Sequence, residues 1–489
     1  MLSNLNKKIL TAGIWSVAMR WSIRFLGIFS TLVLVRLLVP EDFGLVAMAM
    51  IVVGLTSVLL EFGVNMAIIQ SDHASPALYN SAWTLRIFQS MVVTILIILV
   101  IPFAITYFHE PRIAMVLNVI AVSVLINGFE NIGVVAFQKE LDFEKDFKFM
   151  VVKKVLTVAV TLVLAFYLHN YWSLVFGILL GSLLSVVFSY FISSYRPKIE
   201  FSEIKALWAF SQWVLVRNIG AYLQTRLDQI IIGNRLGTEV MGVYTVSDEI
   251  AALPTSEILT PINRVLFPAF SLVKNNKLKL KKLFLDAYQF QCLLAIPMGC
   301  GLFMLADAVV TIVMGEKWLM AIPLIKVLAL VGIALALRHS PSSLLTAIGK
   351  VKLIAIGVWV QLFCFFSLAV FAFPMAGMVG IALIRLLMSS LQTGVFIWIL
   401  VNQGLSSFRQ LLQALWRPIL ASLIMMGGLF LYQSIFTKIA FIHILIQIIF
   451  GALIYIVAVF LLWFLAKKPQ GLEQTLILKY LNRKNNDKS

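Results

Sequence analysis

The chain of 489 residues has only three cysteines and five histidines, and charged residues make up only 12% of it. Soluble globular chains carry about 25% charged residues, so the low value excludes that class. Cys292, Cys300 and Cys364 all lie in apolar segments, which gives neither a disulfide framework nor a zinc-binding spacing. The histidines are scattered, so we expect no metal site and no cofactor. No phosphate loop of the GxxxxGK[ST] type and no nucleophile with a base is found, so we expect no enzyme.

Apolar residues account for 61% of the chain, and the mean hydropathy is +0.97. Apolar windows of about 20 residues are long enough to cross a bilayer as helices. Alternating strand patterns are absent, so the sequence predicts an all-α polytopic membrane protein. We expect no cleaved signal peptide, because "MLSNLNKK" leads directly into the first span. The fourteen predicted spans are 12–38, 45–69, 81–107, 113–137, 149–167, 172–193, 206–233, 241–271, 284–313, 320–346, 351–373, 377–401, 412–435 and 440–465.

The basic residues predict the orientation of these spans. With a cytoplasmic N-terminus, 26 of the 39 Lys and Arg residues fall on the cytoplasmic side and five on the other side, and the rest lie within spans. The positive-inside rule therefore places both termini in the cytoplasm. This distribution accounts for most of the net charge of +17, so no nucleic-acid partner is expected. The basic run 274–282 is interpreted as a loop near anionic membrane lipids.

A weak internal repeat divides the chain. "RLLVPEDFGLVAMA", beginning at Arg36, resembles "RLGTEVMGVYTVS", beginning at Arg235, and the two starts are 199 residues apart. Six spans separate the copies, so both halves enter the membrane in the same direction. Such parallel repeats form two lobes that expose a site between them alternately to each side. We therefore predict an N-lobe at 1–198, a C-lobe at 199–405, and two extra helices with a basic tail at 406–489.

The charges inside the spans point to the substrate. Arg20 and Arg24 lie one turn apart in the first span, on one stripe with Gly27, and no acidic residue lies on that stripe. A charge at the centre of a span costs at least ~2.5–3.5 kcal/mol on insertion scales. Two arginines at this spacing repel each other unless an anion lies near them. Because guanidinium groups bind oxyanions in a bidentate way, the pattern favours a phosphate or diphosphate ligand over a lipophilic cation.

The seventh predicted span carries Arg226 and Asp228, which lie on different sides of a helix because they are two residues apart. Asp228 is as well explained by a structural pair as by contact with substrate or a cation. Structural pairing or snorkelling is likewise an alternative interpretation of Arg86, Lys326, Arg385, Glu61 and Glu130. The predicted substrate-binding residues are Arg20, Arg24, Arg86, Arg217, Gln224, Arg226 and Arg264. The candidates for coupling to an ion are Asp228, Glu61 and Glu130.

Five stretches carry a resemblance to a known family: "VRLLVPEDFGLVAMA", "LEFGVNMAIIQ", "AFQKELDFEKDFKF", "RLDQIIIGNRLGTEVMGVYTVSDEI" and "MGEKWLMAIPLIKVLAL". In their order and spacing they resemble the polysaccharide-transporter branch of the multidrug/oligosaccharidyl-lipid/polysaccharide (MOP) exporters, which includes Wzx-type and colanic-acid-type flippases. The resemblance covers roughly residues 5 to 430 and implies a MATE-like fold. It also implies basic residues in a central cavity, and Arg20, Arg24, Arg217 and Arg226 match that description, with Asp228 in the "D…IG" pattern.

The resemblance implies a multi-pass flippase of the bacterial inner membrane. It would move an oligosaccharide repeat unit linked to undecaprenyl diphosphate between leaflets, for O-antigen, exopolysaccharide or colanic-acid-like synthesis. The implied partners are this lipid-linked substrate, membrane lipids, an H⁺ or Na⁺ counter-ion and a polymerase or export machinery, and nothing demands more than a monomer. Three alternatives stay open: a lipid II flippase, a multidrug/cation antiporter of the same superfamily, and a membrane scaffold without transport activity.

Overall fold

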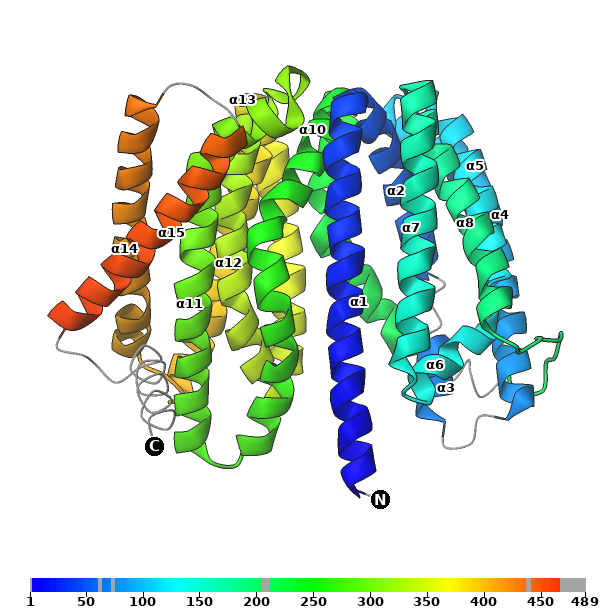
Figure 1. The fold of residues 1–489 in the computed structure, drawn as a ribbon, viewed down its shortest axis with the longest axis horizontal. Coiled ribbons are helices and arrows are strands. Elements are labelled where there is room, and N and C mark those ends of the chain that lie inside the picture. Colours follow the sequence, from blue (N-terminus) through cyan, green and yellow to red (C-terminus); the bar gives the residue numbers. More distant parts are fainter. Residues whose placement is uncertain (1, 60–63, 72–74, 205–211, 437–440, 467–489) are drawn as a thin grey trace. The chain divides into compact units, whose positions relative to one another are not determined.

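The computed structural model describes residues 2–59, 64–71, 75–204, 212–436 and 441–466 (Figure 1). Within these ranges the chain is almost entirely helical and forms no β-strand, which confirms the predicted all-α class. Large apolar side chains stay exposed along the helices, among them Phe103, Phe191 and Phe363. Apolar surface on this scale is stable only in contact with lipid. The chain is therefore a multi-span membrane protein.

The chain forms two compact units, Met1–Thr245 and Val246–Ser489. In the first unit α1 packs on α7, α7 on α8, α4 on α5, and α5 on α8. The boundaries at 198 and 405 that the repeat predicts stay predictions. The helical elements that begin in the first unit are α1 (Leu2–Leu37), α2 (Pro40–Leu59), α3 (Val64–Gln70), α4 (Pro76–Phe108), α5 (Ile113–Gly128), the 3₁₀ turn η1 (Ile132–Val134), α6 (Val135–Lys139), α7 (Phe143–Leu168), α8 (Trp172–Ile192) and α10 (Gln212–Val273).

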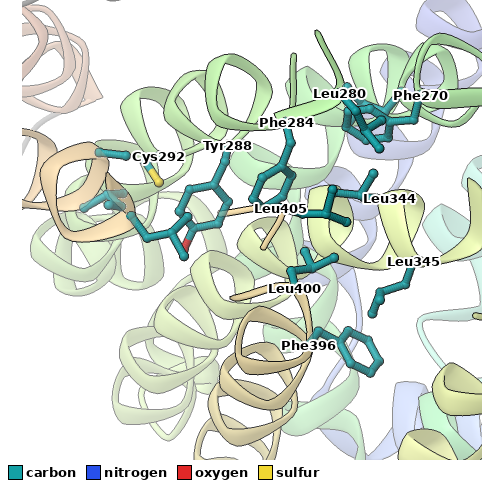
Figure 2. Close-up of a cluster of buried hydrophobic side chains, with 14 residues drawn as sticks. Phe270, Leu280, Phe284, Tyr288, Cys292, Leu344, Leu345, Phe396, Leu400 and Leu405 are labelled. Carbon is teal, nitrogen blue, oxygen red and sulfur yellow. The ribbon is translucent and has the colours of Figure 1, made fainter. Parts of the chain in front are cut away.

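The second unit contains the end of α10 and the remaining helices. Its main core includes side chains from four helices: Phe270 of α10, Phe284 and Tyr288 of α11, Leu344 of α12 and Phe396 of α13 pack together (Figure 2). Inside a bilayer such packing is stabilised by van der Waals contacts, because lipid tails are as apolar as these side chains. The elements are α11 (Lys277–Ala308), the π turn η2 (Val309–Met314), the 3₁₀ turn η3 (Glu316–Trp318), α12 (Ala321–Ala347), α13 (Val351–Asn402), α14 (Phe408–Ile435) and α15 (Phe441–Leu465).

Eleven helices in the described residues are long and apolar enough to cross a membrane, or twelve if the bent pair Ile113–Gly128 and Ile132–Lys139 counts as one span. These twelve correspond to twelve of the fourteen predicted spans. The other two, 206–233 and 241–271, fall on α10, which breaks at Gly237 with φ 79° and ψ −174°. A similar break at Gly377 divides α13 into the predicted spans 351–373 and 377–401. Glycine is the residue that adopts these positive φ values without strain.

Within the first unit, the two copies of the repeat meet at a pair of glycines. A Cβ atom built on Gly44 of α2 would overlap the carbonyl oxygen of Thr238 in α10, and one on Gly242 would overlap that of Pro40. The contact is reciprocal, because in each case the overlapped carbonyl lies four residues before the glycine on the partner helix. Small residues allow membrane helices to approach this closely. We call this contact the glycine crossing.

Candidate functional site

Helix α1 carries the two arginines that the sequence singled out. Arg20 and Arg24 are both half-buried. Helix α7 packs beside this part of α1, and the rings of Trp15 and Phe147 lie 5.0 Å apart. One turn beyond Arg24, a Cβ built on Gly27 would lie 3.9 Å from Cε of Lys154 in α7. The paired helices α1 and α7 therefore present three basic side chains, which we call the basic seam: Arg20, Arg24 and Lys154.

The sequence analysis missed Lys154 because it was assigned to the cytoplasmic flank of the fifth span. Helix α7 begins at Phe143, before the predicted span start at residue 149. With a rise of about 1.5 Å per residue, Lys154 lies ~16 Å along the helix. The signal that could have identified Lys154 was its distance from the start of the helix, and not its place in a run of lysines. Lys154 is half-buried, as the arginines are.

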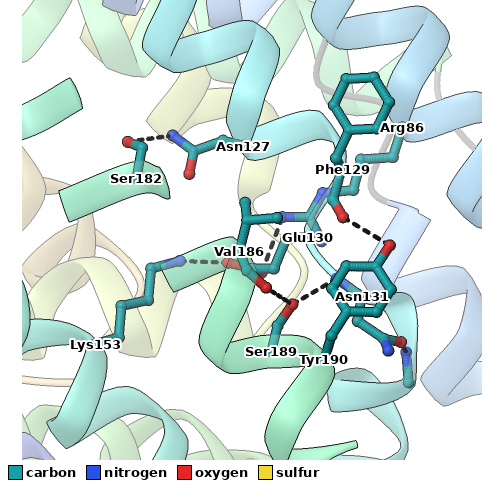
Figure 3. A network of polar contacts seen from close by, with 11 residues as sticks. Arg86, Asn127, Phe129, Glu130, Asn131, Lys153, Ser182, Val186, Ser189 and Tyr190 are labelled. Atoms are coloured by element: carbon teal, nitrogen blue, oxygen red, sulfur yellow. Dashed lines mark hydrogen bonds and ion pairs between the residues drawn. The ribbon is translucent and has the colours of Figure 1, made fainter. Parts of the chain in front are cut away.

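Arg86 and Glu130 bind each other in a polar network of the first unit (Figure 3). Nη2 of Arg86 in α4 lies 2.9 Å from Oε1 of Glu130, and Nζ of Lys153 in α7 lies 2.5 Å from Oε2. The carboxylate, whose side chain is only 8% exposed, therefore lies between two cations. The alternative of structural pairing fits these contacts. A substrate contact for Arg86 and ion coupling for Glu130 stay predictions.

The surroundings of Glu130 are fixed by neighbouring hydrogen bonds. The backbone N–H of Asn131 donates to Oγ of Ser189 at 2.9 Å, and the Tyr190 hydroxyl donates to the Phe129 carbonyl at 3.0 Å (Figure 3). The Asn127 amide donates to Oγ of Ser182 at 3.0 Å. These bonds join the bend after α5 to α8, so the network orders a part of the chain where the helix is interrupted.

On the first segment of α10, Arg226 and Asp228 have separate partners, as their spacing predicts. The Tyr244 hydroxyl donates to Oδ2 of Asp228 at 2.6 Å, and both side chains are buried. Arg226 is exposed and donates to Oε1 of Gln229 at 2.7 Å. Gln224 is half-buried one turn earlier. A role for Asp228 in ion coupling stays a prediction, and in this conformer a tyrosine hydroxyl binds its carboxylate.

The remaining predicted site residues lie in the second unit or are residues whose side chains the structure does not describe. Arg264 is exposed on the segment of α10 that belongs to the second unit. Arg217 lies on α10, where only the backbone is described, and Glu61 lies outside the described residues. The structure therefore brings Arg20 and Arg24 together on α1 and binds Arg86 to Glu130.

The second unit contains a cavity with apolar and polar side chains in its wall that the sequence did not predict. Its volume is about 190 Å³, and it lies among the second segment of α10, α12 and the second segment of α13. Oδ1 of Asp248 lies 3.0 Å from Nη1 of Arg385 at this cavity. The sequence analysis singled out Arg385 as a charge within a span, but periodicity within single helices could not place it in one cavity with Asp248.

The comparisons with known proteins agree with this architecture. Residues 33–323 match the model of a family described as polysaccharide biosynthesis protein. The chain is 27% identical over 429 residues to the lipopolysaccharide biosynthesis protein WzxC of Escherichia coli strain K12, which covers 86% of each chain. It is 25% identical over 334 residues to the succinoglycan biosynthesis transport protein ExoT of Rhizobium meliloti, which covers 68% of this chain and 67% of the relative.

Among solved structures, the lipid II flippase MurJ in an inward closed conformation has the same fold. The TM-score is 0.74 with 17% sequence identity, and the match covers 92% of this chain and 98% of that chain. This likeness establishes the fold alone. The family model spans more than half of the sequence, so the chain belongs to the polysaccharide biosynthesis protein family.

Proposed function

We propose that this protein is a flippase that moves oligosaccharide repeat units, linked by diphosphate to undecaprenol, from the cytoplasmic to the periplasmic leaflet of a bacterial inner membrane. The family and the names of the relatives WzxC and ExoT support a transport step in polysaccharide synthesis. The observation that carries the proposal is the basic seam: Arg20, Arg24 and Lys154 are cationic side chains on paired membrane helices.

The chemistry of the seam suits the charged part of such a substrate. A diphosphate offers several oxygen acceptors, and an arginine fork binds two of them at once, while lysine adds a compact positive charge. Hydrogen bonds to charged groups contribute about 1.5–3 kcal/mol each. The prenyl chain needs no protein partner because it stays in lipid. An inside-negative potential favours outward movement of the anion by about 2.3 kcal/mol per charge per 100 mV.

Flipping makes and breaks no covalent bond, so the protein acts as a transporter and not as an enzyme. Alternating access needs only that two conformations bind the lipid-linked saccharide with different exposure. Coupling to H⁺ or Na⁺ is assigned to Asp228, Glu61 or Glu130. Of these, Asp228 and Glu130 have the partners Tyr244 and Arg86 in this conformer, and coupling would have to exchange those partners.

The basic seam separates this proposal from a multidrug antiporter, because a lipophilic cation is repelled by three positive charges. A lipid II flippase would favour the same basic side chains, and the MurJ likeness, at 17% identity, concerns the fold alone. We therefore test that activity directly. In a strain depleted of its lipid II flippase, expression of this protein should not restore growth, and restored growth would assign lipid II as a substrate.

The proposal is tested in a strain that lacks this gene. Arg20→Gln and Arg24→Gln together should lower export of surface polysaccharide by tenfold or more, since each removes a charge-assisted contact to diphosphate. Lipid-linked repeat units should then accumulate in the cytoplasmic leaflet. Arg36→Gln is the matched control, because Arg36 ends the same helix and is exposed. Normal export by the double variant at equal protein level would overturn the diphosphate-binding role.

A further inference from the structure

The cavity in the second unit has two unlike walls. Leu259, Leu328 and Val331 line it with apolar surface, and Asp248, Asn263 and Arg385 line it with polar groups. A volume of about 190 Å³ corresponds to roughly six water molecules at ~30 Å³ each. This space is small for a whole oligosaccharide but comparable to a single sugar ring. An amphipathic cavity of this size selects for a compact ligand with one apolar face and a polar rim.

The charges of the cavity are balanced within it. The carboxylate of Asp248 and the guanidinium of Arg385 form an ion pair at 3.0 Å, and their side chains are 26% and 19% exposed. A site for diphosphate needs cationic groups in excess of acidic ones, and a site for a lone cation needs negative charge in excess. A balanced pair favours a neutral ligand that can both donate and accept hydrogen bonds.

Neighbouring side chains hold the polar wall in place. Nε2 of Gln291 donates to Oδ1 of Asn263 at 2.8 Å, which fixes the carboxamide that lines the cavity. The hydroxyl of Thr260 donates to the carbonyl of Ser256 at 2.5 Å, and the hydroxyl of Ser256 donates to Oε1 of Glu257 at 3.0 Å. A hydroxyl whose proton is engaged in this way offers its lone pairs to a donor. Sugar hydroxyls are donors of this kind.

We propose that this cavity is a saccharide subsite that receives one uncharged pyranose ring of the lipid-linked oligosaccharide. The C–H face of the ring packs on Leu259, Leu328 and Val331, and its hydroxyl groups bond to the Asp248–Arg385 pair and to Asn263. The inference rests on the proposed flippase function and adds that different residues bind the diphosphate and the sugar. The basic seam of Arg20, Arg24 and Lys154 binds the diphosphate, whatever sugar the lipid carries. The cavity recognises the sugar.

The test measures binding of four defined lipids to the full-length protein in nanodiscs. One is undecaprenyl diphosphate without a sugar, and the others carry glucose, galactose or N-acetylglucosamine on the diphosphate. For the wild type, at least one glycosylated lipid should bind about tenfold more tightly than the sugar-free lipid, which corresponds to one or two net hydrogen bonds. If no glycosylated lipid binds more tightly than the sugar-free one, the subsite is overturned.

Two variants connect that gain to the cavity. Asp248→Asn together with Arg385→Gln removes the ion pair without leaving one charge unpaired, and Ala252→Leu fills space at the cavity wall. Both should abolish the gain from the sugar while leaving affinity for the sugar-free lipid unchanged. Gly427→Ala is the matched control in the same unit, because a Cβ there meets nothing within 4 Å. Thermal unfolding establishes that each variant is folded.

The outcomes separate this inference from the proposed function. A cavity variant that keeps the sugar-dependent gain, or that lowers affinity for both kinds of lipid equally, overturns the saccharide subsite. The variant Arg20→Gln with Arg24→Gln should lower affinity for both kinds of lipid, because both contain the diphosphate. If that variant binds and exports normally, the diphosphate-binding role of the basic seam is wrong. The cavity variants test the saccharide subsite separately, because they are compared on sugar-dependent affinity.

Discussion

At the scale of single residues, Glu130 shows how a buried charge is stabilised in a membrane protein. A buried carboxylate is stable only when it is paired, and here two cations from different helices share it: Arg86 at 2.9 Å and Lys153 at 2.5 Å. Removing the negative charge leaves both cations without their partner in a setting of low dielectric constant. We therefore expect the network to contribute substantially to the free energy of unfolding.

We predict that Glu130→Gln lowers the free energy of unfolding by about 3–5 kcal/mol, the range for breaking a buried ion pair. The measurement is thermal or denaturant unfolding of the purified protein in detergent. Glu144→Gln is the control, since Glu144 pairs with Lys148 at 2.7 Å on an exposed helix surface and should change stability by less than about 0.5 kcal/mol. Equal effects of the two substitutions would contradict the structural role given to Glu130.

Residue-level prediction from the sequence succeeded where the pattern was local. The helical spacing correctly separated Arg226 from Asp228, and the two side chains bind Gln229 and Tyr244 respectively. It could not find that Glu130 joins Arg86 to Lys153, or that Asp248 joins Arg385, because each pair comes from helices distant in sequence. Contacts of that kind depend on tertiary packing, which one helix's periodicity does not encode.

At the scale of helices, hydropathy located the elements and missed their details. The apolar windows correspond to the observed helices because a bilayer requires runs of about this length. They separated the two segments of α10 and of α13, which break at Gly237 and Gly377, but they did not show that α7 begins six residues before the predicted span. A boundary depends on one or two residues, to which a window of 20 residues is insensitive.

The glycine crossing gives a prediction at the same scale. Gly44→Ala should lower the free energy of unfolding by about 1–3 kcal/mol, the usual effect of overpacking, because α2 and α10 must separate to admit the new methyl group. Gly242→Ala should have a similar effect, since the contact is reciprocal. Unfolding and polysaccharide export are both measured. Gly394→Ala is the control, since nothing lies within 4 Å of its Cβ, and a crossing variant as stable and active as this control would show that the close approach is dispensable.

At the scale of the whole molecule, the sequence predicted the class and the family and did not predict the packing units. The resemblance of five stretches predicted the family, the family model over residues 33–323 confirms it, and the MurJ likeness confirms the fold. The compact units divide at Thr245 and Val246, after the break in α10, so the first segment of α10 packs with the N-terminal helices. Tyr222 accounts for part of this packing, as its hydroxyl donates to the Ile51 carbonyl in α2 at 2.7 Å. A tyrosine within a span does not identify its partner helix in advance.

Orientation in the membrane is the prediction that tests the molecule as a whole. The basic residues place the segment 274–282, which includes the first residues of α11, in the cytoplasm and the connection before α12 on the periplasmic side. In a variant whose three cysteines are replaced by alanine, Leu278→Cys, at an 83% exposed position, should react with a membrane-impermeant maleimide only after the membrane is permeabilised. Leu319→Cys, at a 47% exposed position, should react in intact spheroplasts. The opposite pattern would invert the topology and contradict the orientation that the positive-inside rule assigns to the chain. The membrane potential would still favour outward movement of an anionic substrate, because the potential does not depend on how the protein is inserted.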